Sequence, residues 1–382
     1  MRVAIIGSRG IPAKYGGFEV FTEELSTKLS QKGYTVTVTC EEDCSDHASH
    51  YQGVNLAYHP INPPKNYFFR KFYELFGDLY FLVKLSRRND VILLLGMTAG
   101  SLTFLPKILS RSLKLVINID GVEWKRDKFN NFEKAFLKFN TTVATKVSDA
   151  IILDAKSMAH HIDSNVVAKS VYIPYGVNHP VPVEWNNLLL NPLVKICPEI
   201  KNLKKCGFWL AVARLEPENN ILTIIKGFIQ SATEKPLVIV GNFSSPSYQE
   251  EVKSLLAETD KQIFLTGGIY NNSSLLDMLR GHCFAYIHGH SVGGTNPALL
   301  EAMSMKNIII AHDNEFNREV CKESAMFFDS PRALADIVNM VESNPEQYAV
   351  LKQRAYDRVT KDYEWSKVVD AYDALFKELK TR

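Results

Sequence analysis

Residues 288–303 read HGHSVGGTNPALLEAM and are the most informative stretch of the chain. They follow an apolar run, Cys283 to Ile287, that is typical of a strand, and they continue through a glycine-rich turn into a predicted helix. Asn296 is a good N-cap, and Pro297 suits the first helical position because the N–H that it lacks would be unpaired there anyway. The stretch therefore predicts a strand, a tight turn and a capped helix.

The turn has the features of an anion site. Gly293 and Gly294 let a ligand approach the backbone closely, and the N–H groups at the helix start carry roughly half a positive charge. Glu301, about one turn further in, could accept a hydrogen bond from a hydroxyl. A sugar nucleotide offers both phosphates and a ribose hydroxyl. The alternative interpretation is a capped helix after a tight turn, with no ligand.

Strand-like runs alternate with helical periodicity on both sides of this stretch. In the first half the expected strands are Val3–Ile6, Thr35–Thr39, Val91–Leu95, Leu115–Ile119, Ala150–Leu153 and Val171–Ile173. In the second half they are Phe208–Ala213, Leu237–Val240, Ile263–Leu265, Phe284–Ile287 and Ile308–Ala311, with helices at Ile221–Gln230, Gln249–Glu258 and Leu275–Arg280. This rhythm predicts an α/β fold with parallel, doubly wound sheets.

The pattern lapses at 180–205, which is rich in Pro and Asn and is interpreted as a linker or an irregular insert. We therefore expect two Rossmann-like domains, 1–180 and 181–363, with a ligand in the cleft at the carboxyl ends of their strands. Residues 364–382 are assigned to the first domain, since Tyr363 to Leu379 has the spacing of an amphipathic helix that needs an apolar surface.

The composition, 46% hydrophobic and 23% charged over 382 residues, is that of a globular protein. No apolar run approaches the length of a membrane span, and the start, MRVAIIG, lacks a signal peptide. The six cysteines show no CxxC pair and are interpreted as reduced thiols of a cytoplasmic protein. Cys40 and Cys44 lie beside His47 and His50, which is compatible with a metal site or a surface loop. A net charge of +2 gives no indication of nucleic-acid binding.

Gly16 and Gly17 close the first strand-to-helix turn, which does not match the dinucleotide fingerprint GxGxxG. A nicotinamide enzyme is therefore disfavoured. The pair is predicted to open the first helix, as a phosphate-compatible site or as a plain structural turn.

Arg214 directly follows a predicted strand, and its guanidinium could hold a diphosphate through two hydrogen bonds. It could equally form a surface pair with Glu216 or Glu218. Asp120 follows the strand Leu115–Ile119 and could hold a sugar hydroxyl or cap the next helix. The sequence has no Asp-x-Asp, a carboxylate pair that would hold a divalent cation. This absence favours metal-free stabilisation of a leaving group by Arg214, backbone amides and helix ends.

Several long motifs resemble the retaining GT-B glycosyltransferases of family 4 over essentially the whole chain. They are GGFEVFTEEL at 16–25, IPYGVN at 173–178, VARLEPENN at 212–220, FLTGGI at 264–269 and NPALLEAM at 296–303. Three further stretches look most like bacterial rhamnosyltransferases that build capsule and O-antigen units: GSRGIPAKYGGFE at 7–19, NIDGVEWKR at 118–126 and YIHGHSVGGTNP at 286–297. The resemblance implies an acceptor-side first domain and a second domain that binds a nucleotide sugar.

The resemblance also implies site residues. The expected donor-binding residues are Gly16, Gly17, Arg214, Ile269, His288, Gly294, Thr295, Asn296 and Glu301. Arg214 would hold the diphosphate, Glu301 the ribose and Ile269 the base through its backbone. Arg214 and Asp120 are the expected catalytic residues, and Asp120 falls where much of the family has a histidine. No cofactor and no metal are expected.

Two positions depart from the family pattern. Asn219 stands where a lysine is usual, and Gly293 stands where a glutamate is usual, eight residues before Glu301. One cation for the diphosphate and one carboxylate for the transferred sugar are therefore missing. His288 or His290 could substitute, or could be loop histidines without such a role.

The implied reaction is front-face transfer of a hexose with retention, best matched by L-rhamnose from dTDP-rhamnose. The implied acceptor is a saccharide linked to a polyprenyl diphosphate at the inner face of the membrane, in cell-surface polysaccharide synthesis. Residues 66–88 interleave aromatic with basic residues and could form an interfacial helix, or could pack on the sheet. The alternative functions are a nucleotide-sugar epimerase or hydrolase, and a relative that binds a nucleotide sugar without catalysis.

Overall fold

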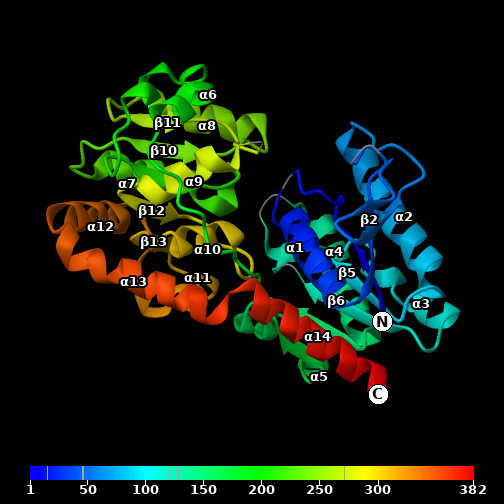
Figure 1. The fold of residues 1–382 in the computed structure, drawn as a ribbon. Coiled ribbons are helices and arrows are strands. Elements are labelled where there is room, and N and C mark those ends of the chain that lie inside the picture. Colours follow the sequence, from blue (N-terminus) through cyan, green and yellow to red (C-terminus); the bar gives the residue numbers. More distant parts are fainter. Residues whose placement is uncertain (15, 45–46, 120, 127–128, 271) are drawn as a thin grey trace. The chain divides into compact units, whose positions relative to one another are not determined.

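The computed structural model describes residues 1–14, 16–44, 47–119, 121–126, 129–270 and 272–382. The chain divides into two compact units (Figure 1). Unit 1 comprises Met1–Gly176 and Trp365–Arg382, and unit 2 comprises Val177–Glu364. The fold is α/β with two parallel-sheet domains, as the alternation of strands and helices predicts.

In its described residues, unit 1 has an eight-stranded sheet in the order β3-β4-β2-β1-β5-β6-β7-β8. The strands are β1 (Arg2–Ile6), β2 (Thr35–Cys40), β3 (His50–Tyr51), β4 (Val54–Tyr58), β5 (Val91–Leu95), β6 (Lys114–Ile119), β7 (Ala150–Leu153) and β8 (Ser170–Tyr172). All pair in parallel except β3, which runs antiparallel to β4. The six strands expected in this half are confirmed, and the β3–β4 hairpin was not expected.

Unit 1 has five α-helices of six or more residues among the described residues. They are α1 (Gly17–Gln31), α2 (Tyr67–Ser86), α3 (Phe104–Leu109), α4 (Asn131–Val147) and α14 (Trp365–Thr381). The expected C-terminal amphipathic helix is confirmed as α14, which packs against unit 1 from the far end of the sequence. Its Tyr372 ring lies 6.0 Å from that of Phe21, and the Tyr372 hydroxyl accepts a hydrogen bond from Asn118 Nδ2 at 3.3 Å.

The sheet of unit 2 is parallel throughout its described strands, in the order β11-β10-β9-β12-β13-β14. These strands are β9 (Trp209–Val212), β10 (Leu237–Val240), β11 (Ile263–Leu265), β12 (Ala285–His288), β13 (Ile309–His312) and β14 (Ala325–Phe328). The strands are short and apolar, as expected where helices cover both faces of a sheet.

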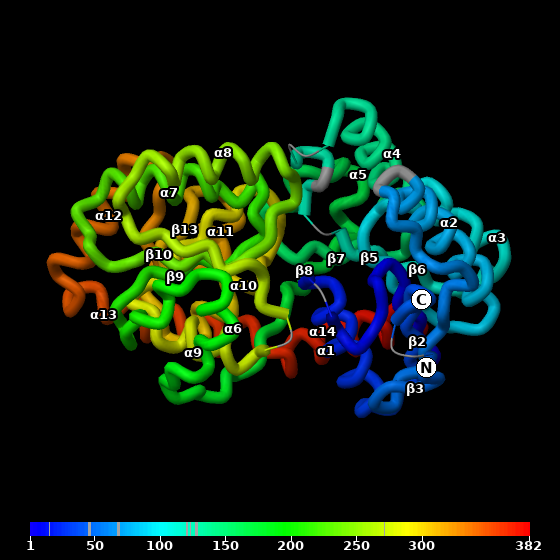
Figure 2. Tube along the Cα trace, turned by 90° about the horizontal axis from the view of Figure 1, so that it is seen from above, coloured from blue at the N-terminus to red at the C-terminus, as the bar shows by residue number. Residues whose placement is uncertain are grey.

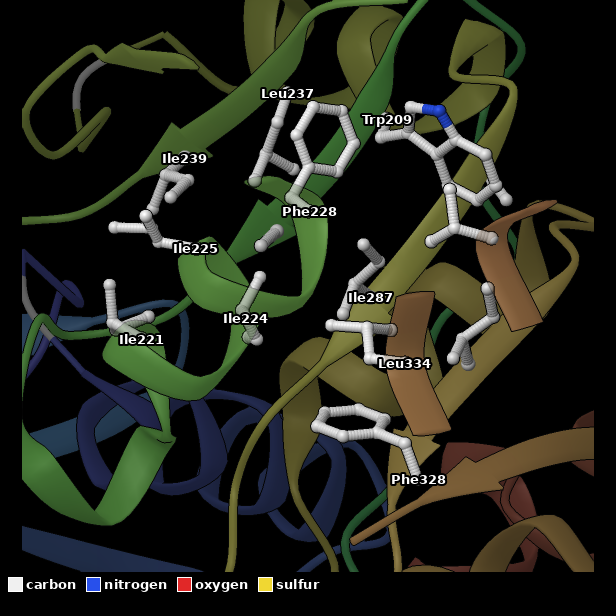
Figure 3. Close-up of a cluster of buried hydrophobic side chains, with 14 of the residues drawn as sticks. Trp209, Ile221, Ile224, Ile225, Phe228, Leu237, Ile239, Ile287, Phe328 and Leu334 are labelled. Atoms are coloured by element: carbon white, nitrogen blue, oxygen red, sulfur yellow. The ribbon is translucent and has the colours of Figure 1, made fainter. Parts of the chain in front are cut away.

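The helices of unit 2 are α6 (Asn191–Val194), α7 (Ile221–Gln230), α8 (Pro246–Ala257), α9 (Ser273–His282), α10 (Pro297–Ser304), α11 (Glu315–Cys321), α12 (Pro331–Ser343) and α13 (Pro345–Asp362). Figure 3 shows the core between α7 and the sheet, where Phe228, Ile224 and Leu237 pack together. Helix α7 approaches α12 closely at Gly227, where a Cβ atom would lie 2.8 Å from the carbonyl oxygen of Pro331.

The stretch 180–205 is an irregular part of unit 2 and not a bare linker. It forms short helical turns at Asn187–Leu190, Asn191–Val194 and Pro198–Asn202. Leu193 and Ile200 of these turns are buried, so the segment adds apolar contacts that its Pro- and Asn-rich composition does not reveal.

Among the described helices, none combines the length and the apolarity that a bilayer crossing would need. All six cysteines have free thiols in this structure.

Candidate functional site

The loops that follow β9 and β12 are neighbours in unit 2, because the two strands pair in parallel. The chain passes from β9 outward to β10 and later from β12 to β13 on the other side, so the strand order reverses between β9 and β12. In open parallel sheets, ligands bind outside the carboxyl ends of the strands at such a reversal. Arg214 follows β9 and His288 ends β12, so both lie at this edge of the sheet.

Hydrogen bonds join the two loops. Asn219 Nδ2 donates to the carbonyl oxygen of Arg214 at 2.7 Å, and Asn219 Oδ1 lies 2.7 Å from His290 Nδ1. Asn220 Nδ2 donates to the carbonyl oxygen of Gly289 at 2.8 Å. A Cβ atom on Gly289 would lie 2.1 Å from the carbonyl oxygen of Asn219, so a side chain there would force the loops apart.

Asn219 therefore has a structural task at the position where the resembling family has a lysine. Its side chain is almost completely buried, and both ends of its amide are used in holding the loops. A neutral amide in these contacts does not supply the missing cation.

Gly293, at the place of the family's usual glutamate, has no room for a side chain. Its φ of +139° lies in a region that L side chains rarely adopt. A Cβ atom there would lie 2.7 Å from Nε2 of His290. The imidazole of His290 thus occupies the space that a side chain at Gly293 would enter, and its Nδ1 is fixed by Asn219.

The helix start predicted at Asn296 and Pro297 is confirmed. Helix α10 begins at Pro297, and Oδ1 of Asn296 accepts a hydrogen bond from the N–H of Ala298 at 3.0 Å. Among the described residues, no acidic side chain lies in the first turn of α10. Gly294 and Thr295 just before it are buried, so the backbone of this turn is enclosed by protein.

Glu301 lies in α10 and forms an ion pair with a buried arginine of α9. Its Oε2 lies 2.5 Å from Nη2 of Arg280, whose side chain is only 6% exposed, whereas the Glu301 side chain is 37% exposed. Burial raises the pKa of Glu301, and the positive charge of Arg280 opposes that rise. The pair therefore presents a fixed carboxylate that is still open to a ligand.

Arg280 is a site residue that the sequence analysis missed. It follows Leu275, Met278 and Leu279, which form the buried face of α9. Its Nε has no hydrogen-bond partner among the described residues, and Asp277 lies 3.8 Å from its Nη1. A buried cation needs a charged or polar partner. An arginine adjoining the apolar face of a helix was the signal available in the sequence.

Arg214 is 56% exposed in its side chain and lies 3.3 Å, through Nη1, from Oε1 of Glu216. The surface pair with Glu216, one of the two alternatives for this residue, is thus present. The Glu216 side chain is only 4% exposed, so the guanidinium partly compensates a buried negative charge. More than half of the Arg214 side chain is exposed, and this part of it can meet a second anion.

His288 is buried at the end of β12, and its Nε2 has no hydrogen-bond partner among the described residues. Burial, with a smaller effect of His312, lowers the pKa of His288 to about 3. The imidazole is therefore neutral near pH 7 and can form a hydrogen bond with a ligand. A neutral ring does not replace the lysine that the resembling family has at the position of Asn219.

Ile269 follows β11 at the same edge of the sheet, two strands beyond β9. The turn before it is held by the N–H of Gly241, which donates to the carbonyl oxygen of Gly267 at 3.0 Å. The N–H of Gly268 donates to Oδ1 of Asn242 at 2.8 Å. The backbone around Ile269 is thereby fixed, and its side chain is half-buried.

Gly16 and Gly17 belong to unit 1, where the predicted helix start is confirmed: Gly16 is the N-cap and Gly17 the first residue of α1. Glu19 lies in the first turn and is buried, and its Oε1 accepts a hydrogen bond from the N–H of Arg9 at 3.3 Å. A carboxylate thus already lies at this helix start.

Asp120, the other expected catalytic residue, lies outside the described residues. The described part of the chain contains no group of three or more His, Cys, Asp or Glu side chains placed to hold a metal ion. In particular, Cys40, Cys44, His47 and His50 do not form such a group.

Two family descriptions match the chain. Residues 1–178 match a domain of unknown function (DUF1972), and residues 198–358 match the family of glycosyl transferases group 1. The curated protein "Glycosyltransferase 1 domain-containing protein 1" of Xenopus tropicalis is 24% identical over 145 residues, which are 37% of this chain. The match spans 41% of that relative's length.

Solved structures share the fold across nearly the whole chain. HepE of Anabaena, crystallised with UDP, has a TM-score of 0.73 at 11% identity, with 99% of this chain and 100% of that chain covered. Sucrose-phosphate synthase of Thermosynechococcus elongatus has a TM-score of 0.78 at 14% identity, covering 99% and 98%. The catalytic domain of starch synthase IV of Arabidopsis thaliana, bound to ADP and acarbose, has a TM-score of 0.73 at 13% identity, covering 100% and 99%.

These neighbours are GT-B glycosyltransferases, and the two parallel-sheet units of this chain follow the same plan. The chain thus has the GT-B fold, and its residues 198–358 match the family of glycosyl transferases group 1.

Proposed function

We propose that the protein is a glycosyltransferase that moves a sugar from a nucleotide-sugar donor to a saccharide acceptor. The observation that carries the proposal is the Glu301 carboxylate on α10, the capped helix after β12. The buried Arg280 fixes this carboxylate by an ion pair, and 37% of the Glu301 side chain remains exposed. The group 1 family match covers this region, and the structural neighbour HepE was crystallised with UDP and with UDP-glucose.

In this proposal unit 2 binds the donor. Glu301 accepts hydrogen bonds from the ribose hydroxyls, and Ile269 contacts the base through its backbone. Arg214 leaves its contact with Glu216 and binds the diphosphate. Gly294, Thr295 and Asn296 offer the backbone of the α10 start to the phosphates or the sugar, and His288 contributes a hydrogen bond as a neutral imidazole. These roles rest on the family resemblance and on the chemistry of each side chain.

The family resemblance supports an acceptor-side role for unit 1, in which Gly16 and Gly17 would bind the diphosphate or the acceptor and Asp120 would bind the sugar. In the reaction, the bond between the sugar C1 and the diphosphate oxygen breaks, and a bond from C1 to the acceptor oxygen forms on the same face. The acceptor hydroxyl gives its proton to the departing diphosphate. Arg214 and the amides at the helix start stabilise the charge on that group, a role that does not require a metal ion.

For the substrates, we propose L-rhamnose from dTDP-rhamnose as the donor and a polyprenyl-diphosphate-linked saccharide as the acceptor, in cell-surface polysaccharide synthesis. The support is the combination of motifs at 7–19, 118–126 and 286–297. A lipid-linked acceptor would bring the protein to the cytoplasmic face of a membrane.

The test uses the purified full-length protein and a panel of donors that includes dTDP-rhamnose and UDP-glucose. Thermal shift identifies the bound donor, and mass spectrometry with NMR then identifies the saccharide product and its anomeric configuration, with and without EDTA. We expect a product with retained configuration that forms only when the acceptor is present. Free or epimerised sugar in the absence of acceptor would indicate a hydrolase or epimerase. Donor binding without release of nucleoside diphosphate would indicate a binding protein.

A further inference from the structure

Three helices of unit 1 cover one face of its sheet. Helix α2 connects β4 to β5, α3 connects β5 to β6, and α4 connects β6 to β7. These three connections run across the sheet in one direction, and the connection from β1 to β2 through α1 runs in the opposite direction. Because such crossovers are right-handed, α2, α3 and α4 lie on the face opposite α1. Helix α14 packs against α1 on that other face. Figure 2 shows α2 and α3 side by side, and the two pack against each other.

Each of the three helices carries a narrow outward stripe of large apolar side chains. In α2 the spacing of three and four residues places them on one side of the helix. The stripes consist of Phe69, Phe72, Phe76, Tyr80 and Val83 on α2, Phe104 and Ile108 on α3, and Phe132, Phe136 and Phe139 on α4. The exposed fraction reaches 81% at Phe132, 71% at Ile108 and 60% at Phe69. We call these ten residues the aromatic face.

Packing on the sheet does not explain the aromatic face. The inward side of α2 is formed by other residues, Phe81, Leu82 and Leu85, which are buried. Helix α2 is therefore apolar on two sides, one that packs within unit 1 and one that meets solvent. Exposed apolar patches of this kind mark interaction sites.

The segments that carry the aromatic face have an excess of positive charge, although Arg70 pairs with Glu41, Lys71 with Glu133 and Lys107 with Asp149. Residues 65–114 contain nine Lys and Arg against three Asp and Glu, and residues 129–147 contain three against one, although the whole chain has a net charge of only +2. One of the four acids, Asp78, has its pKa raised to about 8 by burial and by Glu74, and so adds little negative charge at neutral pH. Lys84 lies with its ammonium 4.9 Å from the Tyr80 ring centre, so a cation borders the apolar stripe.

We propose that the aromatic face docks on a membrane surface that contains anionic lipid. The aromatic side chains enter the interfacial region, and the flanking lysines and arginines contact the headgroups, each contributing about 1 kcal/mol. The mixture of exposed aromatics with excess positive charge favours this partner over a second copy of the chain, since two such faces would repel each other. The inference deepens the proposed function, because a lipid-linked acceptor is reached at that surface.

The test is flotation of the full-length protein with phosphatidylcholine vesicles, with and without phosphatidylglycerol. The variant is Phe69→Ser/Phe76→Ser, and the matched control is Leu188→Ser/Ile196→Ser, which changes two similarly exposed apolar residues of unit 2. We expect the wild type and the control to float with anionic vesicles only, less so as salt is raised, and the Phe variant to bind about tenfold more weakly or worse.

Equal vesicle binding by the wild type and the Phe variant would overturn the proposal, as would binding that is indifferent to lipid charge. A wild-type dimer in analytical ultracentrifugation that the Phe variant abolishes, without vesicle binding, would assign the face to a second copy instead. Thermal shift by nucleotide sugars is measured on the same variants. Donor binding without vesicle binding refutes only the membrane face, and vesicle binding without donor binding or product refutes only the proposed function.

Discussion

A pair of glycines lies at or shortly before the start of both α1 and α10, but the first turns of the two helices differ in charge. At α1, Glu19 lies buried in the first turn, and the carboxylate already compensates the positive end of the helix dipole. At α10, an Asn cap and a proline begin the helix, and no acidic residue lies in the described first turn. A glycine pair thus accompanies a helix start in both units, but of the two helices α1 alone has a carboxylate in its first turn.

The largest expected effect is on Arg214, whose carbonyl oxygen is joined through the Asn219 side chain to His290 in the loop before α10. Arg214→Ala should lower kcat by about 10²–10³, since removing one stabiliser of a developing charge typically costs that much. Arg332→Ala, which changes an exposed arginine on α12 with an Asp336 partner, is the control and should leave kcat unchanged. Near-normal turnover of Arg214→Ala with every active donor would show that the diphosphate is held elsewhere.

The next effect concerns the ion pair behind α10. Arg280→Met should reduce the free energy of unfolding by roughly 1–3 kcal/mol, measured by urea titration, because Glu301 is left half-buried without its partner. It should also weaken nucleotide-sugar binding in calorimetry. The double variant Arg280→Met/Glu301→Gln should regain stability and still bind the donor weakly. Donor affinity equal to wild type in the single variant would separate Arg280 from the donor site.

The two glycine turns can be compared directly by adding one methyl group to each. Gly293→Ala should destabilise unit 2 by about 1–3 kcal/mol, because φ is +139° and the new Cβ would lie 2.7 Å from His290 Nε2. Gly16→Ala meets its nearest atom, Oε2 of Glu19, at 3.5 Å and should cost less than about 1 kcal/mol. Thermal denaturation of both variants measures the difference. Equal losses would contradict the tight packing inferred for the α10 turn.

The smallest expected effect is a pH dependence in unit 2. The pKa of His288 is about 3 in the folded protein, below its ordinary value of 6.5. The unfolded chain therefore binds the proton more readily between these values, and stability falls as the pH drops below about 6.5. Between pH 6.5 and 5.5 the loss should be about 1 kcal/mol.

His288→Asn should flatten this slope in urea titrations of the ligand-free protein. His50→Asn, at an exposed position of unit 1, is the control and should leave the slope unchanged. A slope that survives in His288→Asn would assign the proton uptake to another group.

The regular elements could be predicted because their residues carry the periodicity themselves. The expected strands at Val91–Leu95 and Ala150–Leu153 and the helix at Ile221–Gln230 agree with β5, β7 and α7 residue for residue. The β3–β4 hairpin was not expected: β4 reads VNLAY, of which only Val54 is fully buried, and its pairing with β2 places it in the sheet.

The site could be predicted in part. The cap at Asn296 and the start of α1 at Gly17 follow from local rules, because a cap and its helix are separated by only a few residues. Arg280 could not be predicted, since its pairing with Glu301 depends on how α9 packs beside α10. The role of Asn219 is of the same kind, because its partner His290 lies 71 residues away.

The sequence by itself determined the α/β rhythm, the capped helix starts and the motifs of a sugar-nucleotide enzyme, because these depend on neighbouring residues along the chain. Only the tertiary structure decided which arginine fixes Glu301, and that the aromatic side chains at 69, 72 and 76 point outward. Burial and charge pairing are set by residues distant in sequence, and a periodic pattern does not specify which of two apolar helix sides meets the sheet.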